Sequence, residues 1–211
     1  MKTRLLFIDI QTTGYDPNVD SILQLSGRIR IDGVDVDEFN FFMKPYKENE
    51  VSLEAFKSHG ISQSEAEGFK DQSNAFIAFT SILDKHGFGQ CCGGDLGYVV
   101  GYNVDFDVKF LVEWFKVNND KFLFKRVFTP CIDVMQLAMF ALIGERPNMK
   151  NFSLNTVYEY VFDGDTISDN DAYLNVRATE RLFNNVSRRL LLPWAEMTGN
   201  KVINNRRNIR R

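Results

Sequence analysis

The sequence predicts one mixed α/β domain, and three observations indicate this fold class. Apolar runs that read as strands are joined by tight turns in the first part of the chain, up to Pro45. Segments with apolar residues at helical spacing follow, and short strand-like runs alternate with them. No internal repeat, low-complexity segment or change of composition divides residues 1–200. Strands first and a βα alternation later are typical of a domain with two or three layers.

Strands are expected where apolar residues run together or alternate with polar ones. These segments are residues 5–10, 22–31, 36–44 and 98–102. Asp32-Gly33 has the composition of a hairpin turn between the second and third strands, and Pro45 ends the third. Three early strands joined by tight turns predict an antiparallel pair flanking the first strand.

Helices are expected where apolar residues recur at intervals of three and four. These segments are residues 52–59, 72–86, 107–118, 134–143, 153–162 and 171–192. Ser52 is a typical N-cap residue for the first of them. The end of the last helix sets the expected domain boundary, with a folded domain at residues 1–192 and a basic C-terminal tail at residues 193–211.

The composition is that of a globular protein: 211 residues, 44% of them hydrophobic and 25% charged. No apolar run reaches the ~18 residues of a membrane span, and the run after Arg4 is too short for a signal peptide. The three cysteines, Cys91, Cys92 and Cys131, lack the spacing of a metal-binding knuckle. We therefore expect no membrane association and a reducing, cytoplasmic setting.

The net charge of −3 conceals a basic C-terminal segment. Residues 201–211 hold five of the 25 basic residues and no acid, so residues 1–200 carry 20 basic and 28 acidic residues, a net charge of −8. A basic arm on an acidic body suits contact with phosphate backbones. A solvated terminus without such a role is the alternative interpretation, and both stay open.

The most informative segment is Ile8-Asp9-Ile10-Gln11-Thr12-Thr13-Gly14. Asp9 and Gln11 are two residues apart on the first expected strand, so their side chains point to the same face. Two acids at this spacing can bind hard divalent cations through oxygen. Gln11 has nearly the shape of Glu but lacks its charge. The residue at position 11 therefore bears on whether the protein is an active enzyme or has only the fold of one.

Three ordered motifs resemble those of the DEDD superfamily of 3′→5′ exonucleases, in its DEDDh, proofreading-subunit group. The family's first motif, apolar-Asp-x-Glu-Thr-Thr-Gly, matches the segment above except at Gln11. Its second, Gly-x-Asn-x-x-Phe-Asp-x-x-Phe-Leu, is complete in Gly101-Tyr102-Asn103-Val104-Asp105-Phe106-Asp107-Val108-Lys109-Phe110-Leu111. Its third, His-x-Ala-x-x-Asp-x-x-x-Thr, resembles Asn170-Asp171-Ala172-Tyr173-Leu174-Asn175-Val176-Arg177-Ala178-Thr179.

Two lesser marks agree with this resemblance. They are His59-Gly60-Ile61-Ser62, which is similar to the family's His-Gly-Ile-Thr turn, and Ile132-Asp133-Val134, which is similar to its apolar-Asp-apolar step before a helix. The whole set most resembles the phage-type members, over residues 5–185. The resemblance implies an RNase H-like exonuclease fold, with a mixed five-stranded central sheet flanked by helices.

The resemblance also implies an activity, the two-metal hydrolysis of phosphodiester bonds at single-stranded DNA or RNA 3′ ends. In the family, four carboxylates hold two Mg²⁺ or Mn²⁺ ions and a His acts as general base. Asp9 and Asp107 match two of the metal ligands, Gln11 and Asn175 stand where the other two belong, and Asn170 stands at the base. The positions that match substrate-binding residues are Thr12, Thr13, Gly14, Asn103 and Phe106.

Gln11, Asn170 and Asn175 remove negative charge and a proton acceptor from this implied site. Two carboxylates leave much of the repulsion between two divalent cations in place, so we expect at most one bound ion. Loss of a general base alone costs about 10²–10⁴ in rate, so hydrolysis is expected to be weak or absent. The alternative is a pseudo-nuclease that binds nucleic acid, or a protein such as a polymerase, without cutting.

Five other residues could in principle replace the missing groups. Asp105, Asp169 and Asp171 are interpreted as solvated surface acids, and Asp171 also suits a helix N-terminus. His59 is expected in a turn and His86 at the C-terminal end of a helix, and neither stands at the family's base position. The sequence leaves open whether the three amides are natural or engineered.

Overall fold

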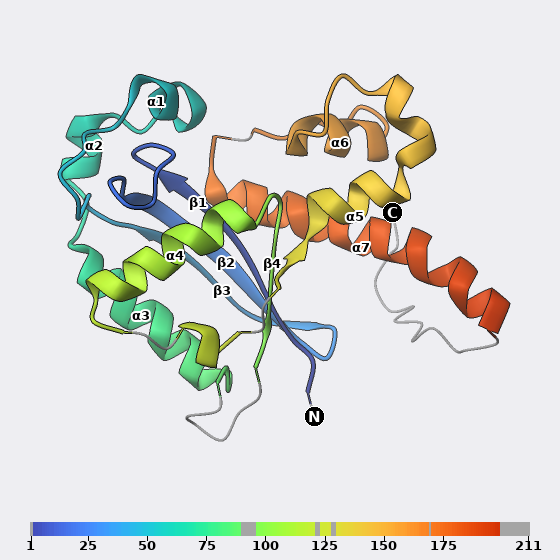
Figure 1. Ribbon diagram of the computed structural model, residues 1–211, viewed down its shortest axis with the longest axis horizontal. Coiled ribbons are helices and arrows are strands. Elements are labelled where there is room, and N and C mark those ends of the chain that lie inside the picture. The colour runs from blue at the N-terminus through green and yellow to red at the C-terminus, as the bar shows by residue number, and fades with distance from the viewer. Residues whose placement is uncertain (1, 90–95, 121–122, 128–129, 169, 199–211) are drawn as a thin grey trace.

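The computed structural model describes residues 2–89, 96–120, 123–127, 130–168 and 170–198. These residues form a five-stranded mixed sheet with helices on both faces (Figure 1). The predicted fold class is therefore confirmed. Cys91, Cys92, Asp169 and the basic residues from Lys201 onward lie outside the described part of the chain.

The sheet has the strand order β3-β2-β1-β4-β5. The central strand β1 (Arg4–Thr12) pairs antiparallel with β2 (Ile22–Ile31), which pairs antiparallel with β3 (Val34–Phe42). On its other side β1 pairs parallel with β4 (Tyr98–Gly101), and β4 pairs parallel with β5 (Ile132–Asp133). The expected antiparallel pair thus lies on one side of β1.

The β2–β3 hairpin turns at Asp32 and Gly33, as the sequence predicted. Their φ angles are 49° and 83°, and positive values at both central residues are required by the tight turn that suits the twist of a hairpin. The turn brings Ile31 opposite Val34 and so sets the register of the pair. β3 is an edge strand, and its acidic side chains discourage pairing with another chain.

Two helices cover one face of the sheet, α3 (Gln72–Lys85) and α4 (Asp105–Val117) (Figure 1). Their apolar sides meet the side chains of β1 that point to this face, among them Leu6 and Ile8. Aromatic rings fill this layer because the chain is rich in Phe. The rings of this layer include Phe76, Phe79, Trp114 and Phe115, with centroids 4.9 to 6.4 Å apart.

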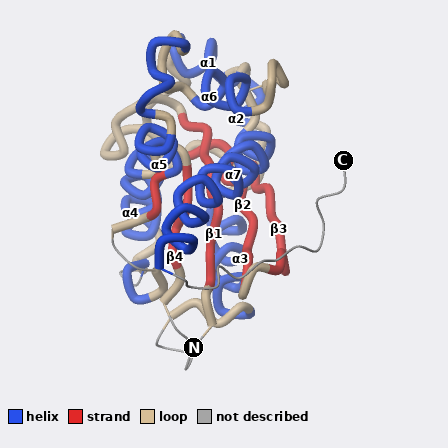
Figure 2. Tube along the Cα trace, turned by 90° about the vertical axis from the view of Figure 1, so that its right-hand side faces the viewer, coloured by secondary structure: helices blue, strands red, loops and turns tan. Residues whose placement is uncertain are grey.

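The opposite face is covered by α5 (Val134–Ala141) and α7 (Ala172–Thr198), and α7 runs across β1 and β2 (Figure 2). Phe7 of β1 packs edge-on against Phe183 of α7, with ring centroids 5.4 Å apart. Successive residues of β1 point to opposite faces, so Asp9 and Gln11 share the α7 side with Phe7.

The remaining described elements are short. They are α1 (Leu53–His59), α2 (Gln63–Glu67), α6 (Leu154–Val161), η2 (Leu123–Lys125) and η3 (Ile143–Asn148). The N-cap predicted at Ser52 is present, since its side chain accepts a hydrogen bond from the Ala55 amide. In the described residues, no helix is both long and apolar enough to cross a membrane.

Several boundaries differ from the expected ones. β1 continues past Ile10 to Thr12, because a shift of register at Gln11/Thr12 lets it keep pairing with β2. α7 continues to Thr198, past the expected end at Leu192. The division into a domain at residues 1–192 and a tail at residues 193–211 stays a prediction.

Candidate active site

Asp9 and Asp107 form the acidic centre of the candidate site. Asp9 lies on β1, and Asp107 lies in the first turn of α4, where it is 4% exposed. Burial raises the pKa of Asp9 to about 8; a hydrogen bond from Asn175 opposes this, and the charge of Asp171 adds to it. Burial, followed by the charge of Asp9, raises the pKa of Asp107 well above its usual range.

A divalent cation fits this pair of carboxylates. The charge of Asp9 raises the pKa of Asp107 because the two carboxylates have little water around them, and a bound cation would relieve this effect. Carboxylate oxygens are also the ligands that Mg²⁺ and Mn²⁺ prefer. The described residues contain no group of three or more His, Cys, Asp or Glu side chains that could hold a metal ion. Within the described residues, Asp9 and Asp107 are thus a pair of carboxylates and not part of a larger metal-binding cluster.

Asn175 approaches the pair from α7. It is 6% exposed, and its Nδ2 donates a hydrogen bond to Asp9 Oδ2 over 3.2 Å. The sequence placed Asn175 at a matching ligand position, and the structure does bring it to Asp9. It does so with an amide hydrogen facing the carboxylate, where an Asp would bring a further negative oxygen.

The other two substituted positions lie in different surroundings. Gln11 is on the same face of β1 as Asp9 and is 8% exposed. It stands opposite Gln24 in the β1–β2 register. Asn170 lies in the turn before α7 and is exposed. Gln11 and Asn175 are thus buried on the side of β1 that carries Asp9, whereas Asn170 is exposed in the turn before α7.

Asp171 is the N-terminal cap of α7. Its carboxylate accepts hydrogen bonds from the Tyr173 amide at 2.8 Å and from Gln24 Nε2 at 2.9 Å. Gln24 Oε1 in turn accepts from the Ala172 amide at 3.2 Å. Gln24, 1% exposed, therefore fastens the start of α7 to β2. This capping role fits the interpretation of Asp171 as an acid at a helix N-terminus.

Asp105 is a solvated surface acid, as predicted, whereas Asp171 is half-buried. The Asp105 side chain is 75% exposed and pairs with Lys109 one turn later on α4. Pairs of this kind contribute little to stability. Asp169, the third acid considered, lies outside the described residues.

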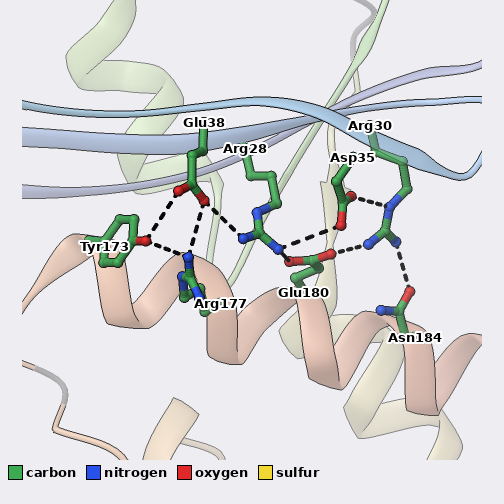
Figure 3. Close-up of polar contacts among 8 residues, drawn as sticks. All are labelled: Arg28, Arg30, Asp35, Glu38, Tyr173, Arg177, Glu180 and Asn184. Carbon is green, nitrogen blue, oxygen red and sulfur yellow. Dashed lines mark hydrogen bonds and ion pairs between the residues drawn. The ribbon is translucent and has the colours of Figure 1, made fainter. Parts of the chain in front are cut away.

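Further along α7, a network of ion pairs holds this helix against the sheet (Figure 3). Arg28 and Arg30 of β2 both contact Glu180 of α7, and the Arg28 Nη1–Glu180 Oε2 distance is 2.8 Å. Glu38 of β3 bridges Arg28 at 2.9 Å and Arg177 of α7 at 3.2 Å. The Glu180 side chain is only 8% exposed, so the contacts of its carboxylate are shielded from water. The network fixes the position of α7 along β2 and so of its first turn beside β1.

The turn that follows β1 uses its own side chains internally. Thr12 Oγ1 donates to the Gly14 carbonyl at 2.5 Å, and Thr13 Oγ1 donates to Asp20 Oδ1 at 3.2 Å. Thr13 Oγ1 also accepts from the Ser21 amide at 2.9 Å. A Cβ at Gly14 would lie 2.5 Å from Asp20 Oδ2, so any larger residue would displace the carboxylate that Thr13 contacts. The threonine hydroxyls expected near substrate therefore shape the turn.

Aromatic side chains border the site. Tyr15 is 66% exposed, and its ring centroid lies 6.4 Å from that of Phe106. Phe106 also packs against Phe110 at 4.9 Å, so it belongs partly to the core. Asn103 is exposed, with a positive φ of 59°, and its amide donates to Asp133 Oδ1 at 3.0 Å. Tyr15 was not among the predicted residues, although it directly follows the first motif.

The fold, with Asp9 on the central strand and Asp107 in the first turn of α4, is that of an exonuclease-type domain. The chain belongs to the RNase T family, described as Exonuclease, whose model matches residues 6–175. That match covers most of the described chain and includes Asp9, Asp107 and Asn175.

Two curated relatives and a solved structure are similar to this chain. The DNA polymerase III PolC-type of Thermotoga petrophila is 30% identical over 153 residues, which are 72% of this chain and 10% of that protein. Ribonuclease T of Buchnera aphidicola subsp. Schizaphis graminum is 28% identical over 124 residues, 54% of this chain and 56% of the relative. Escherichia coli exonuclease I in complex with a dT13 oligonucleotide has a TM-score of 0.72 at 18% identity, over 93% of this chain and 43% of that one. The chain thus spans about a tenth of the PolC-type polymerase and under half of exonuclease I.

Proposed function

We propose that this chain binds the 3′ end of a single-stranded nucleic acid at the Asp9–Asp107 site and hydrolyses it weakly or not at all. The observation that carries the proposal is the hydrogen bond from Asn175 Nδ2 to Asp9 Oδ2. The resemblance implies a metal-binding carboxylate at position 175, and a neutral amide bonded to Asp9 there supports weak or absent hydrolysis. With Gln11 also neutral, the site has two ionisable carboxylates of the four that the resemblance implies.

Asp9 and Asp107 would hold one Mg²⁺ or Mn²⁺ ion. A bound divalent cation supplies a polarised water and a positive charge for phosphate oxygens. A zinc-bound form of the E. coli exonuclease I–single-stranded DNA complex, with a TM-score of 0.68, supports divalent metal binding by this fold. The side-chain amide of Asn170 does not accept a proton near neutral pH, so Asn170 would not act as a general base toward a bound water.

Binding has more support than cutting. Tyr15 and Phe106 offer aromatic rings at the edge of the site, and stacking on such rings contributes about 1–3 kcal/mol per base regardless of sequence. The dT13 complex of exonuclease I and the name ribonuclease T support DNA and RNA respectively. The similarity to a PolC-type polymerase supports a polymerase as a protein partner, which is the second candidate role.

A combined binding and integrity assay tests this function. Labelled dT13, the oligonucleotide bound by exonuclease I, and an RNA of the same length are titrated with the protein in Mn²⁺. Fluorescence anisotropy measures binding, and denaturing gels of the same samples measure shortening. We expect binding of at least one oligonucleotide with its length preserved. Rapid shortening from the 3′ end, or no binding of either, would contradict the proposal.

A further inference from the structure

One short helix, α1, contacts the turn after β1 through both ends of the helix. At its C-terminal end His59 is 7% exposed, and its Nε2 lies 3.0 Å from the Thr12 carbonyl oxygen. At its N-terminal end the Ser52 amide donates to the Thr13 carbonyl over 2.8 Å. Two consecutive carbonyl groups of the turn are therefore bound by the same helix.

The partners of the His59 ring fix its protonation state. A carbonyl oxygen only accepts hydrogen bonds, so Nε2 must carry the proton that it shares with Thr12. The Ile61 amide donates to Nδ1 over 3.0 Å, so Nδ1 carries none. The ring is thus neutral and held in one tautomer. Burial, which lowers the pKa of His59, favours the same neutral form.

These contacts set the orientation of two peptide planes. A trans peptide is planar, and its C=O and N–H point in opposite directions. With the Thr12 carbonyl turned to His59, the Thr13 amide points away from α1 and donates to the Ser21 carbonyl at 2.9 Å. By the same geometry, the bond from Ser52 turns the Gly14 amide away from α1.

We propose that His59 is a positioning residue for nucleic acid, which holds the turn at residues 12–14 in place at the end of the strand that carries Asp9. The inference rests on the proposed function. His59 itself is buried beneath the turn and acts through the Thr12 carbonyl. The expectation from sequence, a plain turn residue, understates its role, because its ring joins α1 to the end of β1.

Two substitutions separate the ring's two hydrogen bonds. His59→Gln keeps a donor near the position of Nε2 and loses the acceptor for Ile61. His59→Asn keeps an acceptor near the position of Nδ1 and is too short to reach Thr12. Each variant loses one ring hydrogen bond, so both are expected to lower the melting temperature. His86→Gln is the matched control, because His86 is the only other histidine and pairs with Asp37 away from the turn.

Anisotropy titrations with labelled dT13 compare these proteins, each checked by its melting temperature. Loss of one hydrogen bond worth about 0.5–1.5 kcal/mol should weaken binding by His59→Asn about twofold to tenfold. His59→Gln and His86→Gln should bind like the unaltered protein. Equal affinities for the two His59 variants, or affinities that follow melting temperature alone, would overturn the inference while leaving the proposed function intact. No binding by the unaltered protein would overturn both.

The tautomer gives a test that needs no variant at position 59. In protein labelled with ¹⁵N at histidine, the ring of His59 should show a protonated Nε2 and an unprotonated Nδ1. The chain has two histidines, so His86→Gln assigns the signals. A proton on Nδ1 of His59 would contradict the donor role toward Thr12.

Discussion

Asn175 Nδ2 donates a hydrogen bond to Asp9 Oδ2 over 3.2 Å, and this contact joins α7 to the central strand at the acidic centre of the site. The amide lowers the pKa of Asp9, but burial outweighs it and leaves that pKa raised. A neutral donor thus only partly stabilises this half-buried carboxylate. A cation would stabilise the ionised carboxylate of Asp9 more strongly than the amide does.

The first prediction concerns metal binding. Calorimetric titration with Mn²⁺ should give at most one site per chain, and Asp107→Asn should abolish it. Asn175→Asp should tighten binding at least tenfold, because a unit charge about 4 Å from a cation is worth several kcal/mol at an effective dielectric of about 20.

Asn184→Asp is the control for that substitution. It makes the same chemical change on the same helix, where Asn184 bonds to Arg30 in the ion-pair network (Figure 3). Mn²⁺ affinity should be unchanged in this variant. Two full sites in the unaltered protein would show that two carboxylates suffice for a metal pair.

The second prediction concerns stability as a function of pH in the absence of metal. Burial raises the pKa of Asp9 from 3.8 to about 8, so between these values the folded protein holds a proton that the unfolded chain releases. Stability should therefore fall as pH rises from about 4 to about 8. Urea unfolding in EDTA measures this, and the difference between the unaltered protein and Asp9→Asn isolates it.

Mn²⁺ should reverse the trend, since it replaces the proton and binds the ionised form. Its stabilising effect should be larger at pH 8 than at pH 6. A difference curve between the two proteins that is flat or rises with pH would contradict the raised pKa of Asp9.

The third prediction concerns the ion-pair network. Glu180→Ala should lower the free energy of unfolding by about 3 kcal/mol, because it removes the more buried of the two carboxylates that contact both Arg28 and Arg30 and leaves them to share only the more exposed Asp35. Glu38→Gln, at a side chain 46% exposed, should cost no more than about 1 kcal/mol. Equal effects of the two, measured by urea unfolding, would mean that Glu180 does not anchor α7.

The fourth prediction concerns the basic C-terminal segment. Deleting residues 201–211 removes five positive charges and no negative one. Binding of single strands should weaken, and the dependence of log affinity on log salt should become shallower. If the affinity and its salt dependence are unchanged, the segment is a solvated terminus without a role in binding.

Much of the fold could be predicted because short stretches of the sequence determine its strands, turns and helix caps. The bounds of β2 were predicted at both ends, and the N-cap at Ser52 and the hairpin turn at Asp32-Gly33 were predicted from residue type alone. Elements of few residues were not placed as separate elements. β5 has two residues and α2 has five, too few for a periodic pattern to emerge.

The site was predicted less completely, because its geometry depends on contacts between distant parts of the chain. The motifs pointed to Asp9 and Asn175, but not to an amide hydrogen facing the carboxylate. Asp171 accepts a hydrogen bond from Gln24, 147 positions away, and no local signal links them. His59 was expected in a turn, and its bond to Thr12 spans 47 positions.

Our central claim is that hydrolysis is inefficient because too little negative charge remains at this site and Asn170 stands in place of the general base. A nuclease assay of the chain beside its triple variant Gln11→Glu, Asn170→His, Asn175→Asp tests it most directly, on labelled single-stranded DNA and RNA in Mn²⁺. The unaltered chain should shorten 3′ ends at least ~10³-fold more slowly than the triple variant. Comparable rates for the two proteins, both free of contaminating nuclease, would contradict the claim.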